Sequence, residues 1–312
     1  MEGKVQISTP WVDPVPDELD RQKYAGYLTD FLKRREGEYV LNLNAPWGLG
    51  KTYFLKNWQA ELEGKHPVVY INAWENDFSD DPLITIVNEI LNGGSSYLSE
   101  FKNETAERID GITKKSYKFI KKLSPTIFAA MMRKALGEEG LDDVKDIFGE
   151  ETEKALVTLM EKATQHLVRE HDEKVKSVKD FKESITALID LIFHYQEGLA
   201  KPFYVFIDEL DRCRPSFAVE MLERIKHLFM LKDVVFVIAT DSNQLQHSVK
   251  AIYGEGFNGH EYLKRFFNQE FTLPEPSHYR FAKYLVSSSG NVGLDKIDFC
   301  GLKGSKSSLK YW

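Results

Sequence analysis

Cysteine is scarce in this chain of 312 residues, and long hydrophobic runs are absent. The two cysteines, Cys213 and Cys300, lie far apart and form no Cys-x-x-Cys or Cys/His cluster, which argues against a disulfide framework or a zinc site. The histidines show no metal-ligand spacing, and His166 and His171 stand in a charged helical pattern. No segment approaches the roughly 20 apolar residues of a membrane span, and residues 1–4 do not begin a secretory signal. We therefore expect a cytoplasmic protein without a membrane span.

The chain also lacks an excess of positive charge. Its net charge is −7, so it offers no overall basic field to a nucleic-acid backbone. One stretch is locally basic, and its lysines are Lys114, Lys115, Lys118, Lys121 and Lys122. Such a run is usually a solvated helix face, and the alternative is a surface for nucleic acid or anionic lipid. Nucleic acid therefore stays open as a partner.

Apolar residues are plentiful, at 42% of the chain, and their arrangement predicts an α/β fold. A helical pattern runs from Leu19 to Leu32. Strand-like apolar runs follow at 39–43, 68–72, 203–207 and 234–239, with a further candidate at 271–273. These runs do not alternate with polar residues, and helical patterns separate them. We therefore expect a parallel sheet that helices cover on both faces.

Residues 44–52 read N-A-P-W-G-L-G-K-T and stand between the first strand and a helical pattern. A strand, a glycine loop and a helix start form a phosphate cradle, in which Lys51 neutralises phosphates and the Thr52 hydroxyl ligates Mg²⁺. Ala45 replaces the first glycine of the G-x-x-x-x-G-K-[ST] pattern. The residues that we expect at the nucleotide are Pro46, Trp47, Gly48, Leu49, Gly50, Lys51, Thr52 and Tyr53.

The third apolar run ends in two consecutive acids, Asp208 and Glu209. Beside a phosphate loop, the first acid can hold Mg²⁺ and the second can activate water. We therefore expect Asp208 as a metal residue, and Glu209 and Lys51 as catalytic residues. The alternative is that D-E-L-D only opens a helix, because acids favour helix N-termini.

Further polar residues follow the other strands. Thr240 and Asp241 end the fourth strand, where they either sense the γ-phosphate or cap the next helix. Trp74 and Glu75 follow the second strand and could point toward the carboxyl edge of the sheet, where ligands bind. The alternative, which we favour, is that Trp74 packs against the helix after the loop. The transition state also needs a positive charge, and the candidates are Arg212, Arg214, Arg224, Lys264 and Arg265. Another copy of the chain could supply this cation instead, which would require an oligomer.

Between the second and third strands, charged residues dominate and only helical spacing appears. We interpret this part as an all-helical insertion. The expected division of the chain is a first half of a nucleotide-binding core at 17–92, the insertion at 93–201, a second half of the core at 202–276 and a C-terminal tail at 277–312.

Four segments together resemble the KAP family of P-loop NTPases. They are A-P-W-G-L-G-K-T at 45–52, I-N-A-W-E at 71–75, F-I-D-E-L-D-R-C-R-P at 206–215 and F-V-I-A-T-D at 236–241. The resemblance extends from about residue 19 to residue 276 and includes Y-L-K-R-F-F-N-Q-E-F-T-L-P-E-P at 262–276. It implies a P-loop NTPase core with an additional strand, related to AAA+ and STAND ATPases. The insertion is too polar for the membrane helices that many members carry, so we expect a soluble, bacterial-type member.

The resemblance implies Mg²⁺-dependent ATP hydrolysis, coupled to a conformational change or to assembly. ATP is preferred over GTP because the chain has no N-K-x-D motif. Bacterial KAP proteins are often associated with defence against phage, so partners from a defence system or a homo-oligomer are expected. Two alternatives stay open: a nucleotide-gated scaffold with little hydrolysis, and a small-molecule kinase.

Overall fold

The computed structural model describes residues 9–12, 17, 19–35, 37–78, 81–123, 167–228 and 231–275, without the side chains of 167–175. The expectations for the side chains of His166 and His171 and for the tail at 277–312 lie outside these residues.

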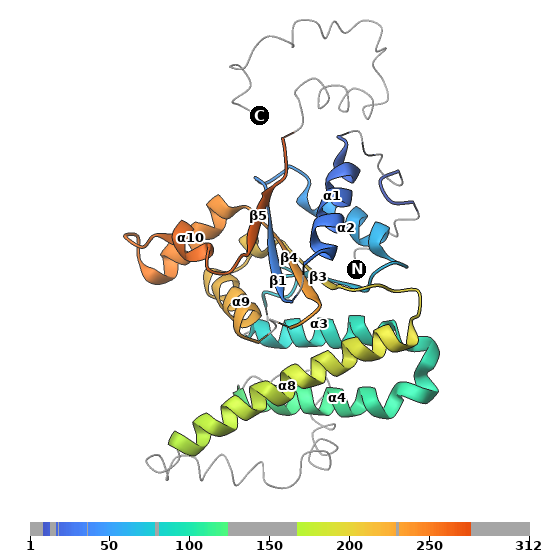
Figure 1. The fold of residues 1–312 in the computed structure, drawn as a ribbon. Coiled ribbons are helices and arrows are strands. Elements are labelled where there is room, and N and C mark those ends of the chain that lie inside the picture. The colour runs from blue at the N-terminus through green and yellow to red at the C-terminus, as the bar shows by residue number, and fades with distance from the viewer. Residues whose placement is uncertain are drawn as a thin grey trace, which may run out of the picture.

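Five parallel strands form one sheet, in the order β2-β3-β4-β1-β5 (Figure 1). The strands are β1 (Tyr39–Asn44), β2 (Val68–Asn72), β3 (Phe203–Asp208), β4 (Val234–Thr240) and β5 (Gln269–Thr272). The expected parallel sheet and its first four strands are confirmed. The fifth strand begins two residues earlier than the apolar pattern predicts, because this edge strand opens with the exposed polar residues Gln269 and Glu270.

Helices cover both faces of the sheet (Figure 1). One face carries α1 (Arg21–Lys33) and α2 (Lys51–Leu62), and the other carries α3 (Pro82–Ser96), α9 (Pro215–Leu228) and α10 (Ser242–Tyr253), followed by the short α11 (Gly259–Leu263). Alternate residues of each strand point to opposite faces, so a strand buried on both sides must be apolar throughout. All six residues of β3 are buried, which explains its unbroken apolar sequence before Asp208.

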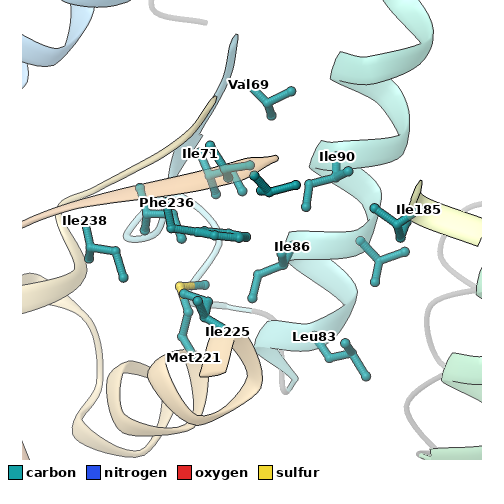
Figure 2. Close-up of a cluster of buried hydrophobic side chains, with 14 of the residues drawn as sticks. Val69, Ile71, Leu83, Ile86, Ile90, Ile185, Met221, Ile225, Phe236 and Ile238 are labelled. Atoms are coloured by element: carbon teal, nitrogen blue, oxygen red, sulfur yellow. The ribbon is translucent and has the colours of Figure 1, made fainter. Parts of the chain in front are cut away.

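The larger core lies between the sheet and α3 and α9. Figure 2 shows Ile86 and Ile90 of α3 and Met221 of α9 gathered against Ile71 and Phe236 of the sheet. Burial of each such side chain contributes roughly 1.5–3 kcal/mol. Because Ile71 and Phe236 belong to strands that end at the polar edge of the sheet, this core also fixes where those ends lie.

A pair of long helices extends from α3 (Figure 1). After the turn η1 (Ser99–Phe101), α4 (Lys102–Leu123) runs beside α8 (Leu167–Tyr195), with Phe119 stacked on Phe181 at 4.4 Å between ring centroids. The chain then returns to the sheet, where the Ala200 N–H donates to the Lys65 carbonyl at 2.8 Å. No helix in the described part of the chain is both long and apolar enough to cross a membrane.

Helix α3 packs closely against its neighbours at two glycines, Gly93 and Gly94. A Cβ atom at Gly93 would lie 2.7 Å from Val69 Cγ2, and one at Gly94 would lie 2.9 Å from Leu188 Cδ2. The missing side chains therefore allow α3 to contact both β2 and α8.

We predict that Gly93→Ala lowers the free energy of unfolding by about 1–3 kcal/mol, because the stiff Val69 side chain cannot easily give way. Alanine alone favours a helix over glycine by about 1 kcal/mol. Gly111→Ala in α4 is the matched control, since nothing lies within 4 Å of its added Cβ, and it should be neutral or stabilising. Denaturant unfolding measures both variants, and equal stabilities would contradict the close contact.

Candidate functional site

The strand register brings the polar strand ends together at one edge of the sheet. Asn44 of β1 lies opposite Thr240 of β4, and Asn72 of β2 lies opposite Asp208 of β3. Because the strands are parallel, all these residues stand at the carboxyl edge, where ligands bind in open α/β sheets. The loop after β1 and the acids after β3 therefore belong to one site.

The loop at 44–52 has the backbone that its glycines require. Gly48 has a φ of +83° and Gly50 a φ of +80°, a region that glycine enters without steric cost. Ala45 is not among the residues with positive φ, so a side chain is tolerated at this position. The Ala45 N–H donates to the Thr240 carbonyl at 3.0 Å, which ties the start of the loop to β4.

The start of α2 suits an anion. Gly50 caps this helix without a side-chain hydrogen bond, and the first turn contains no acidic residue. The first N–H groups of the helix and its dipole are therefore available to a phosphate. Lys51 opens the helix with a side chain that is 9% exposed, and its Nζ donates to the Ala45 carbonyl at 2.7 Å. Thr52 and Tyr53 follow in the same turn.

Asp208 is a fully buried carboxylate at the end of β3. Its Oδ2 accepts a hydrogen bond from the Tyr70 hydroxyl at 2.8 Å, and its Oδ1 accepts one from the Glu209 N–H at 2.9 Å. Burial and the Asp208 carboxylate raise the pKa of Tyr70, which keeps this hydroxyl protonated. An oxygen-only ligand at this position fits Mg²⁺.

Glu209 makes the sharp turn after the strand, with a φ of +60°. Such a conformation is rare for a residue with a side chain and is typical of functional sites. The Arg212 guanidinium pairs with its Oε1 at 2.9 Å, and the Asn72 amide donates to its Oε2 at 3.2 Å. Only the short turn η2 (Leu210–Arg212) follows directly, and α9 begins later, at Pro215.

Asp211 contacts three groups from two segments, the loop at 44–52 and the end of β4. Its Oδ2 accepts hydrogen bonds from the Trp47 indole at 2.6 Å and from the Asp241 N–H at 2.8 Å, and it lies 3.6 Å from Lys51 Nζ. This side chain is 1% exposed. Sequence reasoning assigned no role to Asp211, although its place in D-E-L-D was a signal.

Thr240 and Asp241 occupy the end of β4, between the loop strand and the acid strand. The Thr240 hydroxyl donates to Asn42 Oδ1 at 2.8 Å within a buried polar network. Asp241 caps α10, accepting from the Asn243 N–H at 3.0 Å and from the Gln244 N–H at 3.3 Å. The capping alternative is therefore confirmed for Asp241.

The expected packing of Trp74 against the helix after the loop is wrong. Its side chain is 53% exposed, and the Arg212 guanidinium lies over its ring at 5.6 Å. The turn after β2 carries Trp74 outward, because the Asn72 side chain accepts from the Trp74 and Glu75 N–H groups at 3.1 and 3.3 Å. Asn72 is thus a site residue that sequence reasoning missed, and its signal was a polar residue at the end of an apolar strand.

Of the five candidate cations, the structure brings Arg212 to the acid pair. The other four candidates contact other residues. Arg214 pairs with Asp77, Arg224 with Glu220 and Lys264 with Glu261, and the Arg265 guanidinium lies over the Tyr262 ring.

A further arginine, Arg21, holds the loop from the side of α1 and was also missed by sequence reasoning. It donates to the Leu49 carbonyl at 3.2 Å and to the Pro274 carbonyl at 2.6 Å. Its side chain is buried, and burial lowers the pKa of its guanidinium. Arg21 thereby joins α1, the phosphate loop and the segment after β5.

The parallel sheet with β4 between β1 and β3, the glycine loop and the start of α2 without a side-chain cap define a P-loop NTPase domain. The chain belongs to the KAP family, because a model of the KAP family P-loop domain matches residues 21–297. Membership implies a nucleotide-binding protein, with Mg²⁺ as the typical metal. A comparison with curated proteins finds no match.

We predict that Tyr70→Phe lowers the free energy of unfolding by about 1–3 kcal/mol, because Asp208 would lose a donor while it stays buried. Tyr204→Phe on the neighbouring strand is the matched control. The Tyr204 hydroxyl is buried and has no hydrogen-bond partner among the described residues, so its removal should be nearly neutral. Thermal or denaturant unfolding compares the two, and equal effects would show that the hydroxyl does not support Asp208.

Proposed function

We propose that the chain is a Mg²⁺-dependent ATPase whose cycle drives a conformational change or assembly. The observation that carries this proposal is the contact of the Lys51 segment with the D-E-L-D turn across the carboxyl edge of the sheet. Lys51 stands at a free helix N-terminus, and the acids of the turn begin at the buried Asp208. This combination supplies the positive charge for a triphosphate and the carboxylates for a metal and a water.

Each residue then has a role. The loop from Pro46 to Gly50 and the start of α2, Lys51 to Tyr53, would surround the phosphates. The Thr52 hydroxyl and the Asp208 carboxylate would hold Mg²⁺, which would neutralise negative charge on the phosphates. Glu209 would orient the attacking water and accept its proton.

The partners of Glu209 define what must change before catalysis. Arg212 occupies one of its carboxylate oxygens and Asn72 the other. The ion pair with Arg212 makes the Glu209 carboxylate a weaker base, so we expect Arg212 to move away before Glu209 activates a water molecule. Arg212, once released, would be free to approach the charge that develops on the phosphates. Another copy of the chain could supply a cation as well, which would require a homo-oligomer.

The wider setting also remains a proposal. We take 17–92 and 202–276 as the halves of the nucleotide-binding core, 93–201 as the helical insertion that responds to the cycle, and 277–312 as a tail. ATP is proposed over GTP because the N-K-x-D motif is missing. The cytoplasm and anti-phage defence are the proposed location and role, and the second rests on the family resemblance.

A nucleotide-gated scaffold is the second candidate function, because both oxygens of Glu209 already have partners. A protein that keeps this arrangement would bind ATP and hydrolyse little of it.

We predict that the wild-type chain releases phosphate from ATP with Mg²⁺ and that Lys51→Ala and Glu209→Gln each reduce the rate by about 100-fold or more. Lys51→Ala should also lose ATP affinity, whereas Glu209→Gln should keep it. Steady-state phosphate release across a series of protein concentrations, together with calorimetric ATP binding, measures both quantities.

Asp233→Asn is a control, because this acid precedes β4 at the opposite edge of the sheet and pairs with Lys201. It should leave the rate unchanged. A rate that rises more than linearly with protein concentration would indicate a site shared between copies. ATP binding without phosphate release would reject the ATPase in favour of the scaffold.

A further inference from the structure

Asp211 is the acid that faces Lys51 in this structure. Lys51 Nζ lies 3.6 Å from Asp211 Oδ2, and both side chains are almost fully buried. The other acids of the turn have other partners, since Asp208 binds Tyr70 and Glu209 binds Arg212. An ammonium group with so little access to water is costly without an opposite charge. Asp211 supplies that charge where no phosphate does.

The two members of this pair differ in how firmly they are held. Asp211 Oδ2 is fixed by the Trp47 indole at 2.6 Å and by the Asp241 N–H at 2.8 Å. Lys51 has a flexible four-carbon stem, and its Nζ donates to the Ala45 carbonyl at 2.7 Å but lies 3.6 Å from the Asp211 oxygen. The carboxylate therefore cannot follow the ammonium group when Lys51 turns toward a phosphate, and the attraction between them must weaken.

We propose that Asp211 is the resting counter-ion of Lys51 and competes with nucleotide phosphates for it. Asp211 is thus a positioning residue that limits nucleotide affinity and favours release. The inference rests on the phosphate site of the proposed function, but it does not depend on hydrolysis. The expected change in affinity separates this role from a structural one. Removal of the Asp211 charge should strengthen nucleotide binding, whereas damage to a merely structural residue would weaken it.

Asp211→Asn is the informative variant. Its amide oxygen can still accept from Trp47 and from the Asp241 N–H, while the negative charge is lost. We expect the Asp211→Asn variant to bind ADP about tenfold more tightly than the wild type does, because the pair between Asp211 and Lys51 no longer opposes binding. In a Glu209→Gln background, the same substitution should strengthen ATP binding by about the same factor. Isothermal titration calorimetry with Mg²⁺ measures these affinities.

Asp233→Asn is the matched control, since it removes an acid remote from the loop at a position with a φ of +63°, which asparagine accepts. Its nucleotide affinity should equal that of the wild type. Equal or weaker binding by Asp211→Asn would overturn the inference. Nucleotide binding without phosphate release would reject the proposed ATPase and leave the inference standing, whereas a wild type that binds no nucleotide would overturn both.

A second measurement needs no nucleotide. The melting temperatures of Lys51→Met, Asp211→Asn and the double variant form a double-mutant cycle. If the two residues neutralise each other, the melting temperature of the double variant should fall by clearly less than the sum of the decreases in the two single variants. Additive losses would show that Asp211 is not the counter-ion of Lys51, whatever the nucleotide affinities are.

Discussion

The insertion of β4 between β1 and β3 is the constraint on which the site depends. Strand β4 separates the phosphate loop from the acids after β3. The register of the strands then places the loop and the acids at the same carboxyl edge of the sheet. Backbone hydrogen bonds continue this order past the strands, from the Ala45 N–H to the Thr240 carbonyl and from the Ala73 N–H to the Asp208 carbonyl. The apolar residues hold the strands in place, so the polar residues that end them arrive together.

Charge neutralisation within the chain is the second organising feature of the site. Lys51 faces Asp211, Glu209 faces Arg212, and Asp208 is held by the Tyr70 hydroxyl and a backbone N–H. Lys51, Asp208 and Asp211 are buried, and burial makes an unpaired charge costly. A ligand must therefore replace existing partners, and the strength of those contacts governs how readily the site changes state.

Sequence reasoning found the parts of the site that local chemistry determines. Glycines before a lysine at a helix start, and an acid pair after an apolar strand, have few other uses, so the loop and Asp208 were predictable. Tyr70, Asp211 and Arg21 were not, because a polar side chain reveals its partner only when distant strands and loops meet. Trp74 was misplaced for a related reason: hydrophobicity predicts burial, but the turn held by Asn72 directs the ring outward.

Helix α3 connects this edge of the sheet with the helical pair α4 and α8. Asp81 caps its start by accepting from the Leu83 N–H at 2.8 Å, and Gly93 and Gly94 allow contact with Val69 of β2 and Leu188 of α8. Contacts this close leave little room for the three elements to slide independently, because packed interiors move as units. Strand β2, whose last residue Asn72 binds Glu209, is thus linked to α8 by packing through α3. Glycine lowers the stability of a helix, but at these two positions its missing side chain permits the close packing of α3.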